Sequence, residues 1–362
     1  MTTDHSHDEP YYPLGKLPQS ELMTLLRRFS SKLDVRVVLG PGLGHDAAVI
    51  DFGDRYLVTK TDPITFATDQ IGWYVVHINA NDVACVGARP RWFVVTLLLP
   101  EKKTDRSLVL CIFDQVEAAA QELGVSVVGG HTEVTAGLDR PIAIGSMFGE
   151  IEPARLVRSD GARPGDMLIL TKGIAVEGTA ILARELAGSL TSKVDSRLIE
   201  RASAFLTDPG LSVVKDAMIA TSAGEVHAMH DPTEGGVATG IREMVEAADL
   251  GATIDAQALP YFPETLALCR TLALDPLGLI ASGALLLAVA PRDANTIIQA
   301  LGEAGIRAAV IGQVRAEPGV DLQIDGELHP FPAFRRDEIA RLFESLGEGT
   351  TTSEHDDASP LI

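Results

Sequence analysis

The sequence has 362 residues, 46% of them apolar, which is enough for two domains of ordinary size with cores of their own. Its formal net charge of −20 opposes binding to nucleic acids and to anionic membranes, since both require clustered basic side chains. The three cysteines form no CxxC pair, the N-terminus is polar, and no long uncharged apolar window occurs. We therefore expect a cytoplasmic protein with reduced thiols that binds neither nucleic acid nor membrane.

The first half of the chain alternates between apolar runs and Gly-, Asp- or Pro-bearing turns. Residues 1–13 are expected to form a disordered tail, and a helix is predicted over residues 19–29. Further helices are predicted over residues 69–87, where apolar residues cover all sides, and over residues 105–123, before Gly124. The predicted strands are Val35–Leu39, Ala47–Phe52, Tyr56–Thr61, Arg91–Leu99, Val125–Val128 and Pro141–Glu150.

A cluster of Pro, Gly and charged residues over 152–166 predicts a domain boundary, after which the alternation starts again. In this second half, strands are predicted over residues 167–171, 226–230, 284–289 and 308–314, and helices over residues 176–186, 197–222, 236–248 and 292–304. The predicted class is α+β, with domains at 14–155 and 156–345 and a second disordered tail at 346–362.

Four aspartates stand where an apolar element meets a turn or where a charge is costly to bury. Asp46 precedes a predicted strand, Asp62 follows one, Asp82 lies inside an apolar helix, and Asp231 lies between a strand and a helix. Carboxylates are hard oxygen ligands that suit Mg²⁺, and Mg²⁺ in turn bridges phosphate oxygens. Simpler interpretations stay open, because Asp82 can pair with a neighbouring Asn and Asp231 can cap the following helix.

The segment VVGGHTEV, residues 127–134, predicts a buried strand that runs into a sharp turn. Two glycines let the backbone approach a ligand closely, and successive N–H groups can hold a phosphate. A simple tight turn explains the same residues. His131 and His230 adjoin these motifs and suit acid–base chemistry near neutral pH. Cys85, one turn after Asp82, is expected to be a small packing residue rather than a nucleophile.

Taken together and in order, seven motifs resemble the AIR synthase-related family, most closely its HypE branch of hydrogenase-maturation factors. The resemblance covers roughly residues 14–340. The motifs are GHDAAVI (44–50), KTDP (60–63), NDVACVGARP (81–90), VVGGHTEV (127–134), TKGIAVEGTAIL (171–182), HDPTEGGVATGI (230–241) and LDPLGLIASGALLLAV (274–289).

The resemblance implies a two-domain fold in which N-terminal domains of two chains share a β-barrel, so that the protein is a homodimer. The second domain is expected to be an α/β sandwich. Mg²⁺ would be held by Asp46, Asp62 and Asp82, and ATP would be bound near the dimer interface. The implied nucleotide-binding residues are Lys60, Asn81, Gly129, Gly130 and Thr132, and the implied catalytic residues are His131, Glu133 and Asp231.

The implied activity is ADP-forming phosphoryl transfer from ATP to an oxygen of a small-molecule or protein-borne substrate, whose identity the sequence does not specify. The sequence departs from the HypE branch in having no cysteine after Cys269, where that branch carries a terminal one. It also has His45 and His131 where relatives often carry acids. These departures keep a second hypothesis open, a nucleotide-binding regulatory or scaffold protein without turnover. A third hypothesis is that the carboxylates are structural.

Overall fold

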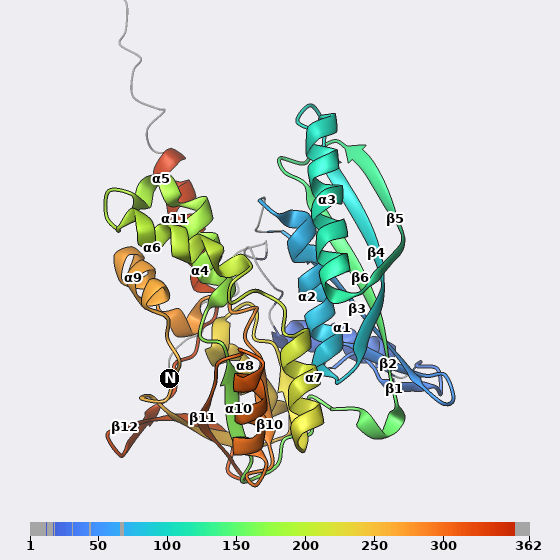
Figure 1. The fold of residues 1–362 in the computed structure, drawn as a ribbon, viewed down its shortest axis with the longest axis vertical. Coiled ribbons are helices and arrows are strands. Elements are labelled where there is room, and N and C mark those ends of the chain that lie inside the picture. The colour runs from blue at the N-terminus through green and yellow to red at the C-terminus, as the bar shows by residue number, and fades with distance from the viewer. Residues whose placement is uncertain are drawn as a thin grey trace, which may run out of the picture.

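The computed structural model describes Tyr12, Leu17 and the ranges 19–30, 32–42, 45–65 and 69–351. Within these residues the strands form two sheets, one of six strands and one of seven. Figure 1 shows the two sheets in separate halves of the molecule, with helices between them. This arrangement confirms the predicted α+β class.

The six-stranded sheet has the order β1-β2-β3-β6-β4-β5 and comes entirely from the first half of the chain. Its strands are β1 Val37–Leu39, β2 Ala48–Asp51, β3 Tyr56–Ile64, β4 Arg89–Pro100, β5 Ser126–Thr135 and β6 Ile142–Ile151. The helices of this half are α1 Gln19–Ser30, α2 Ile71–Cys85 and α3 Arg106–Leu123. Helices α2 and α3 cover one face of the sheet (Figure 1).

Helix α2 is the element that joins the two halves. Every one of its residues except Trp73 is buried, as expected for a helix that is apolar on all sides. One side packs on β3 and β6, and the other contacts helix α7, Val214–Ala223, and strand β8, Val226–His230, of the second half. The side chains of α2 therefore face both halves at once.

The seven-stranded sheet has the order β13-β12-β9-β11-β7-β10-β8. Its other strands are β7 Met167–Thr171, β9 Gly251–Asp255, β10 Leu286–Val289, β11 Ala308–Arg315, β12 Gly319–Ile324 and β13 Glu327–Pro330. The other helices are α4 Val176–Glu185, α5 Ala187–Leu190, α6 Ser196–Ser203, α8 Gly236–Ala247, α9 Pro263–Leu272, α10 Ala294–Glu303 and α11 Glu338–Thr351. Short 3₁₀ turns occur at η1 Pro153–Arg155, η2 Ala204–Leu206 and η3 Pro276–Gly278.

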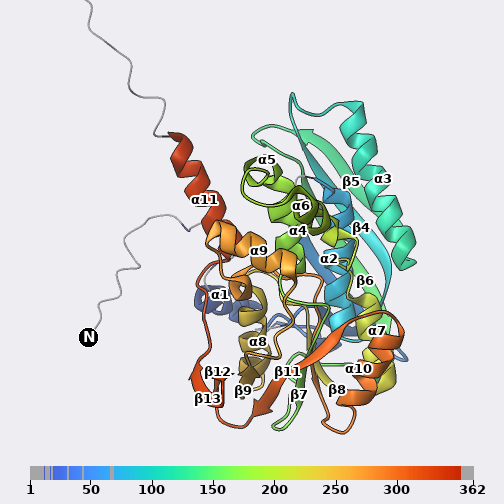
Figure 2. The same cartoon turned by 60° about the vertical axis from the view of Figure 1, so that its left-hand side comes forward.

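Helices cover both faces of this second sheet, as Figure 2 shows from the side. On β10, Leu286 and Ala288 belong to the core on the α8 side, and Leu287 and Val289 to the core under α7 and α10. All four residues of this strand are buried, as expected for a strand covered on both faces.

Three local predictions are wrong. The strand predicted over Val125–Val128 neither ends in a turn nor is buried: β5 continues through Gly129 and Gly130 to Thr135, and its side chains are almost all exposed. The helix predicted over 197–222 is two helices, α6 and α7, because Pro209 and Gly210 interrupt it. Helix α11 continues to Thr351, into the predicted C-terminal tail.

The rest of that tail, residues 352–362, and nearly all of the predicted tail 1–13 lie outside the described residues. No helix of the described residues is long and apolar enough to cross a membrane.

Candidate functional site

The last turns of α2 carry polar side chains into the interior of the molecule. Asn79, Asp82 and Cys85 are three residues apart, so they follow one another along one side of the helix. The exposed fractions of Asp82 and Cys85 are only 3% and 1%. A carboxylate with so little contact with water needs a partner of opposite charge or a metal ion.

Lys60 provides positive charge for two of the predicted aspartates. Lys60 and Asp62 alternate along β3 and therefore point to the same face of the sheet, toward α2. The Lys60 Nζ lies 3.1 Å from the Asp82 carboxylate and 3.3 Å from the Asp62 carboxylate. Burial works against the ammonium, but Asp82, Asp62 and Asp46 outweigh it and raise the pKa of Lys60. The lysine is therefore charged.

Asn79 fixes the position of Asp62, a role that the sequence analysis missed. The Asp62 N–H donates to Asn79 Oδ1 at 2.8 Å, and Asn79 Nδ2 donates to the Asp62 carbonyl at 3.2 Å. The helix thus holds the backbone of β3 at the residue whose side chain enters the site. The only sequence signal was an amide one turn before Asp82 in an otherwise apolar helix.

Asp231 enters the site from the second half of the chain, directly after β8. It is fully buried, and the Cys85 thiol donates to its Oδ1 at 3.3 Å. Its Oδ2 has no hydrogen-bond partner among the described residues. Burial, followed by the negative charge of Asp46, raises the pKa of Asp231 to about 6.

Asp46 is held by a histidine of the second half. The ring Nδ1 of His230 lies 3.0 Å from both Asp46 carboxylate oxygens, and its Nε2 lies 3.1 Å from Glu243. Burial lowers the pKa of His230, but the two carboxylates outweigh that effect and raise the pKa well above its usual value. A charged His230 therefore ties Asp46 to the strand that leads to Asp231.

The structure thus brings Lys60 and all four predicted aspartates together at the junction of the two halves. Burial raises the pKa of Asp82, Lys60 lowers it, and the negative charges of Asp231, Asp62 and Asp46 raise it further. Asp46, Cys85 and Asp231 each offer one ligand atom, and these three atoms lie within 4.8 Å of one another. The arrangement can hold a cation and orient an anion bound to it.

The side chain of Asn81 is occupied elsewhere. Its Nδ2 donates to the Leu211 carbonyl and its Oδ1 accepts from the Val213 N–H, both at 2.8 Å. These bonds link α2 to the segment that leads into α7. The amide therefore has a structural role, and the nucleotide contact that the resemblance implies remains a prediction.

The predicted residues of the 129–133 segment lie away from the aspartates within one chain. The register places Gly130 opposite Val95, Val95 opposite Gly145, and Gly145 opposite Asp62. Three interstrand spacings, about 14 Å, therefore separate Gly130 from Asp62. Thr132 lies on the same edge strand, as do His131 and Glu133, whose exposed side chains are 3.0 Å apart.

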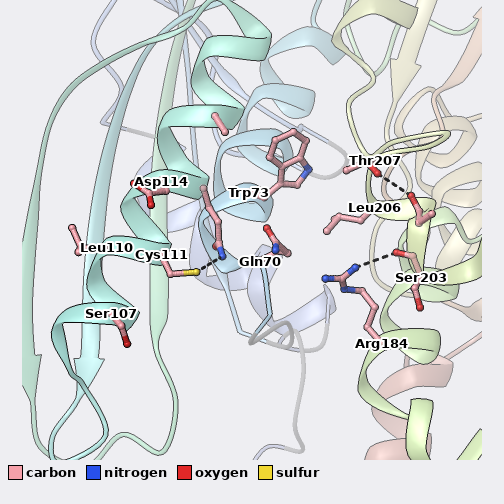
Figure 3. A pocket seen from close by; sticks show the side chains of 13 residues that line it. Gln70, Trp73, Ser107, Leu110, Cys111, Asp114, Arg184, Ser203, Leu206 and Thr207 are labelled. Carbon is pink, nitrogen blue, oxygen red and sulfur yellow. Dashed lines mark hydrogen bonds between the residues drawn. The ribbon is translucent and has the colours of Figure 1, made fainter. Parts of the chain in front are cut away.

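A cavity of about 690 Å³ lies at the opposite end of α2, between α3 and the α4–α6 region (Figure 3). Trp73, Cys111 and Arg184 are among its lining residues, and it contains no residue of the predicted site. Trp73 is nine residues before Asp82, about 14 Å along the helix axis. The carboxylates, rather than this cavity, define the candidate site because only they combine burial, charge and convergence.

The two sheets and the acidic site between them define a two-domain α+β protein with carboxylates from both domains. The sequence matches the N-terminal domain of AIR synthase related proteins over residues 44–151 and their C-terminal domain over residues 163–325. The chain therefore belongs to the AIR synthase related family.

The chain is also similar to several named proteins. Carbamoyl dehydratase HypE of Rhizobium leguminosarum bv. viciae is 30% identical over 290 residues, which cover 78% of this chain and 80% of the relative. A chain of a HypE–HypF complex superposes with a TM-score of 0.71 at 23% identity, covering 86% of this chain and 99% of that one. HypE in complex with ATP gives a TM-score of 0.63 at 26% identity, covering 87% and 96%.

Proposed function

We propose that the chain is an ATP-dependent enzyme that activates a substrate oxygen by phosphoryl transfer, with Mg²⁺ bound by Asp46, Asp62 and Asp82. The observation that carries this proposal is the convergence of these aspartates with Asp231, from four separate segments, in one buried site. So many carboxylates in a buried place favour a bound cation. The HypE relative that binds ATP has the same fold and supports the choice of nucleotide.

The donor set fits a magnesium ion. Its carboxylate oxygens are the hard ligands that Mg²⁺ prefers. Bound Mg²⁺ supplies positive charge that offsets the charge of the phosphates. Lys60, held between Asp62 and Asp82, adds a fixed positive charge beside them. Asp231 is the proposed proton acceptor, because its buried carboxylate enters the site from the second half and its Oδ2 has no hydrogen-bond partner among the described residues.

We place the remaining predicted residues in the site of a second chain. In one chain, the proposed nucleotide-binding residues Gly129, Gly130 and Thr132 and the proposed catalytic residues His131 and Glu133 lie on β5, about 14 Å from Asp62. They are too far away to contact a phosphate group bound at Asp62. Because β5 is the exposed edge of its sheet, a second copy can approach it. A homodimer with a shared β-barrel brings β5 of one chain to the carboxylates of the other.

The proposed acceptor is a carbonyl, amide or phosphate oxygen. The phosphoryl group leaves ATP as ADP is released and becomes bonded to this oxygen. The HypE relatives are named carbamoyl dehydratases, and one of the HypE structures is a complex with HypF. The complex with HypF favours an acceptor presented by a partner protein over a free small molecule.

Asp82→Asn tests the proposal because it removes the charge and keeps the shape. We expect the affinity for Mg·ATP, measured by calorimetry, to fall about 10- to 100-fold, since contacts to charged groups contribute roughly 1.5–3 kcal/mol. Asp139→Asn, at an exposed turn, is the matched control and should leave the affinity unchanged. A folded Asp82→Asn protein with the affinity of the wild type would contradict the metal role.

The competing function is a nucleotide-binding regulator without turnover, favoured by histidine at positions 45 and 131. ADP release with candidate acceptors distinguishes the two. Release that depends on an acceptor supports the enzyme. Tight Mg·ATP binding with no ADP from any carbonyl, amide or phosphate acceptor, free or protein-borne, supports the regulator.

A further inference from the structure

One of the donor groups in the site is a thiol rather than an oxygen. Cys85 Sγ lies among the Asp46 and Asp231 carboxylates, with the three ligand atoms within 4.8 Å of one another. They come from three separate segments: the residues before β2, the end of α2, and the residue after β8. Cys111 is exposed and Cys269 lies in α9, so neither contributes to this group.

Asp46 forms an ion pair with His230, but Asp231, the other carboxylate of this group, forms none within the described residues. Lys60 forms ion pairs with Asp62 and Asp82, whereas Asp231 forms no ion pair with any lysine or arginine of the described residues. Asp231 is fully buried, and its Oδ2 has no hydrogen-bond partner in that part of the chain. A buried carboxylate oxygen without a partner costs free energy that a bound cation would recover.

The distance between the sulfur and one of the carboxylate oxygens suits two ligands of one ion. Two ligands of tetrahedral Zn²⁺, a sulfur at about 2.3 Å and an oxygen at about 2.0 Å, lie roughly 3.5 Å apart. The observed separation between Cys85 Sγ and Asp231 Oδ1 is 3.3 Å. His230 lies 3.0 Å from both oxygens of Asp46 and so fixes the orientation of this carboxylate, as the outer partners of metal ligands commonly do.

We propose that Cys85, Asp46 and Asp231 form a binding site for a thiophilic divalent cation such as Zn²⁺ or Co²⁺. Binding breaks the S–H bond, releases that proton to solvent and forms a sulfur–metal bond. Mg²⁺ prefers oxygen ligands and gains little from the sulfur, so the thiol selects for the softer ions. Three protein ligands leave a fourth position for water or an external ligand. The site does not require ATP, although it shares Asp46 with the proposed Mg²⁺ site.

Cobalt titration tests the site directly. The full-length chain, reduced and stripped of metal, is titrated with Co²⁺ without nucleotide. We expect one equivalent to produce the charge-transfer absorption of a thiolate–cobalt bond, and Zn²⁺ to remove it by displacement. Cys85→Ser should abolish this absorption, whereas Cys111→Ser and Cys269→Ser should retain it. Competition with a chromogenic chelator measures the Zn²⁺ affinity of Cys85→Ser. We expect this affinity to fall by more than the roughly 10- to 100-fold that is lost when a residue bonded to a metal ligand, rather than the ligand itself, is removed.

Asp231→Asn provides a second variant that keeps the thiol and removes a carboxylate. It should weaken Co²⁺ and Zn²⁺ binding while circular dichroism shows the fold of the wild type. Absence of the thiolate–cobalt band in the wild type, or its persistence in Cys85→Ser, would overturn the proposal. Because no nucleotide is present, either result leaves the Mg·ATP calorimetry as an independent test of the proposed enzyme.

Discussion

The positive charge of Lys60 offsets the negative charges of two neighbouring carboxylates. Its ammonium lies about equally far from Asp62 and Asp82, and its side chain is 22% exposed. Removal of one member of a mostly buried ion pair leaves the other charges uncompensated, which costs more than the pair itself contributes. The stability of the folded protein therefore depends on the positive charge of Lys60 between these two carboxylates.

Lys60→Met should lower the free energy of unfolding by about 3 kcal/mol near neutral pH, because Asp62 and Asp82 lose their counter-charge. Added Mg²⁺ should restore part of that loss by taking the place of the ammonium. Urea unfolding with and without Mg²⁺ measures both effects. A control, Lys103→Met at an exposed pair with Asp139, should change little. Equal sensitivity of the two variants would contradict this account of Lys60.

Glu177, in the first turn of α4, is a buried acid that the sequence analysis did not identify. Its side chain is 6% exposed, and its Oε2 has no partner among the described residues. Burial raises its pKa from 4.5 to about 7, and the nearby charges of Asp337 and Glu234 act in the same direction. Because the folded state holds this proton more tightly than the unfolded state, the contribution of Glu177 to stability falls as pH rises from about 4.5 to about 7.

Glu177→Gln should remove that pH dependence. At pH 8 the variant should be more stable than the wild type by a few kcal/mol, on the order of 1.4 kcal/mol for each unit of pKa difference. At pH 4 the two proteins should be equally stable, because Glu177 is protonated in both states. Denaturant midpoints across this range give the comparison. A constant difference between the two proteins at every pH would contradict a raised pKa.

Strand β5 has a composition that is typical of a turn. Its two glycines and the polar residues after them predicted a loop, yet β5 pairs with β4 in parallel from Ser126 to Thr135. The two glycines differ in their surroundings. A Cβ on Gly130 would lie 2.0 Å from the Val95 carbonyl oxygen, whereas a Cβ on Gly129 meets nothing within 4 Å. Gly130 is thus required by strand pairing.

Gly130→Ala should separate β5 from β4 and lower the free energy of unfolding by about 2 kcal/mol or more, in the range of other overpacking substitutions. Gly129→Ala is the matched control, one residue away, and should change stability by less than about 1 kcal/mol in either direction. Hydrogen exchange at the β5 amides, together with urea midpoints, reports the loss of pairing. Similar exchange rates in the two variants would show that Val95 does not impose this constraint.

The sequence predicted the elements whose pattern is local. Helix α2 was predicted because its apolar residues extend without interruption, and Asp82 was singled out as the charge within it. Asn79 could not be assigned a role, since its partner is the backbone of Asp62 on another element. The exposure of β5 depends on how its sheet is paired. The break between α6 and α7 depends on Pro209, whose effect the apolar pattern of residues 197–222 did not reveal.

For the whole molecule, the face of the first sheet opposite α2 is the expected dimer surface. A Cβ on Gly145 would meet Asn79 of α2, so the neighbouring Ile144 points to the other face, where it is half-buried. Val94, Thr96 and Leu98 of β4 follow the same alternation and are half-buried too. A sheet with one apolar face covered only in part favours a partner there.

Ile144→Glu should convert a dimer into monomers, because it places a charge on that face. Analytical ultracentrifugation should give twice the chain mass of 38.5 kDa for the wild type and the single mass for the variant. ATP turnover should be lost with the dimer. Leu110→Glu, at an exposed position of α3, is the control and should remain dimeric. A wild-type protein that sediments at the mass of one chain would contradict the shared barrel.

Helix α2 packs against the first sheet, contacts α7 and β8 of the second half, and ends in the residues of the acidic site. The two halves therefore share this helix as part of both cores. If one half unfolds, the other loses the helix that covers its inner side. Heating should unfold both halves in a single cooperative transition. A ligand that binds at Asp82 should raise the melting temperature of both halves together.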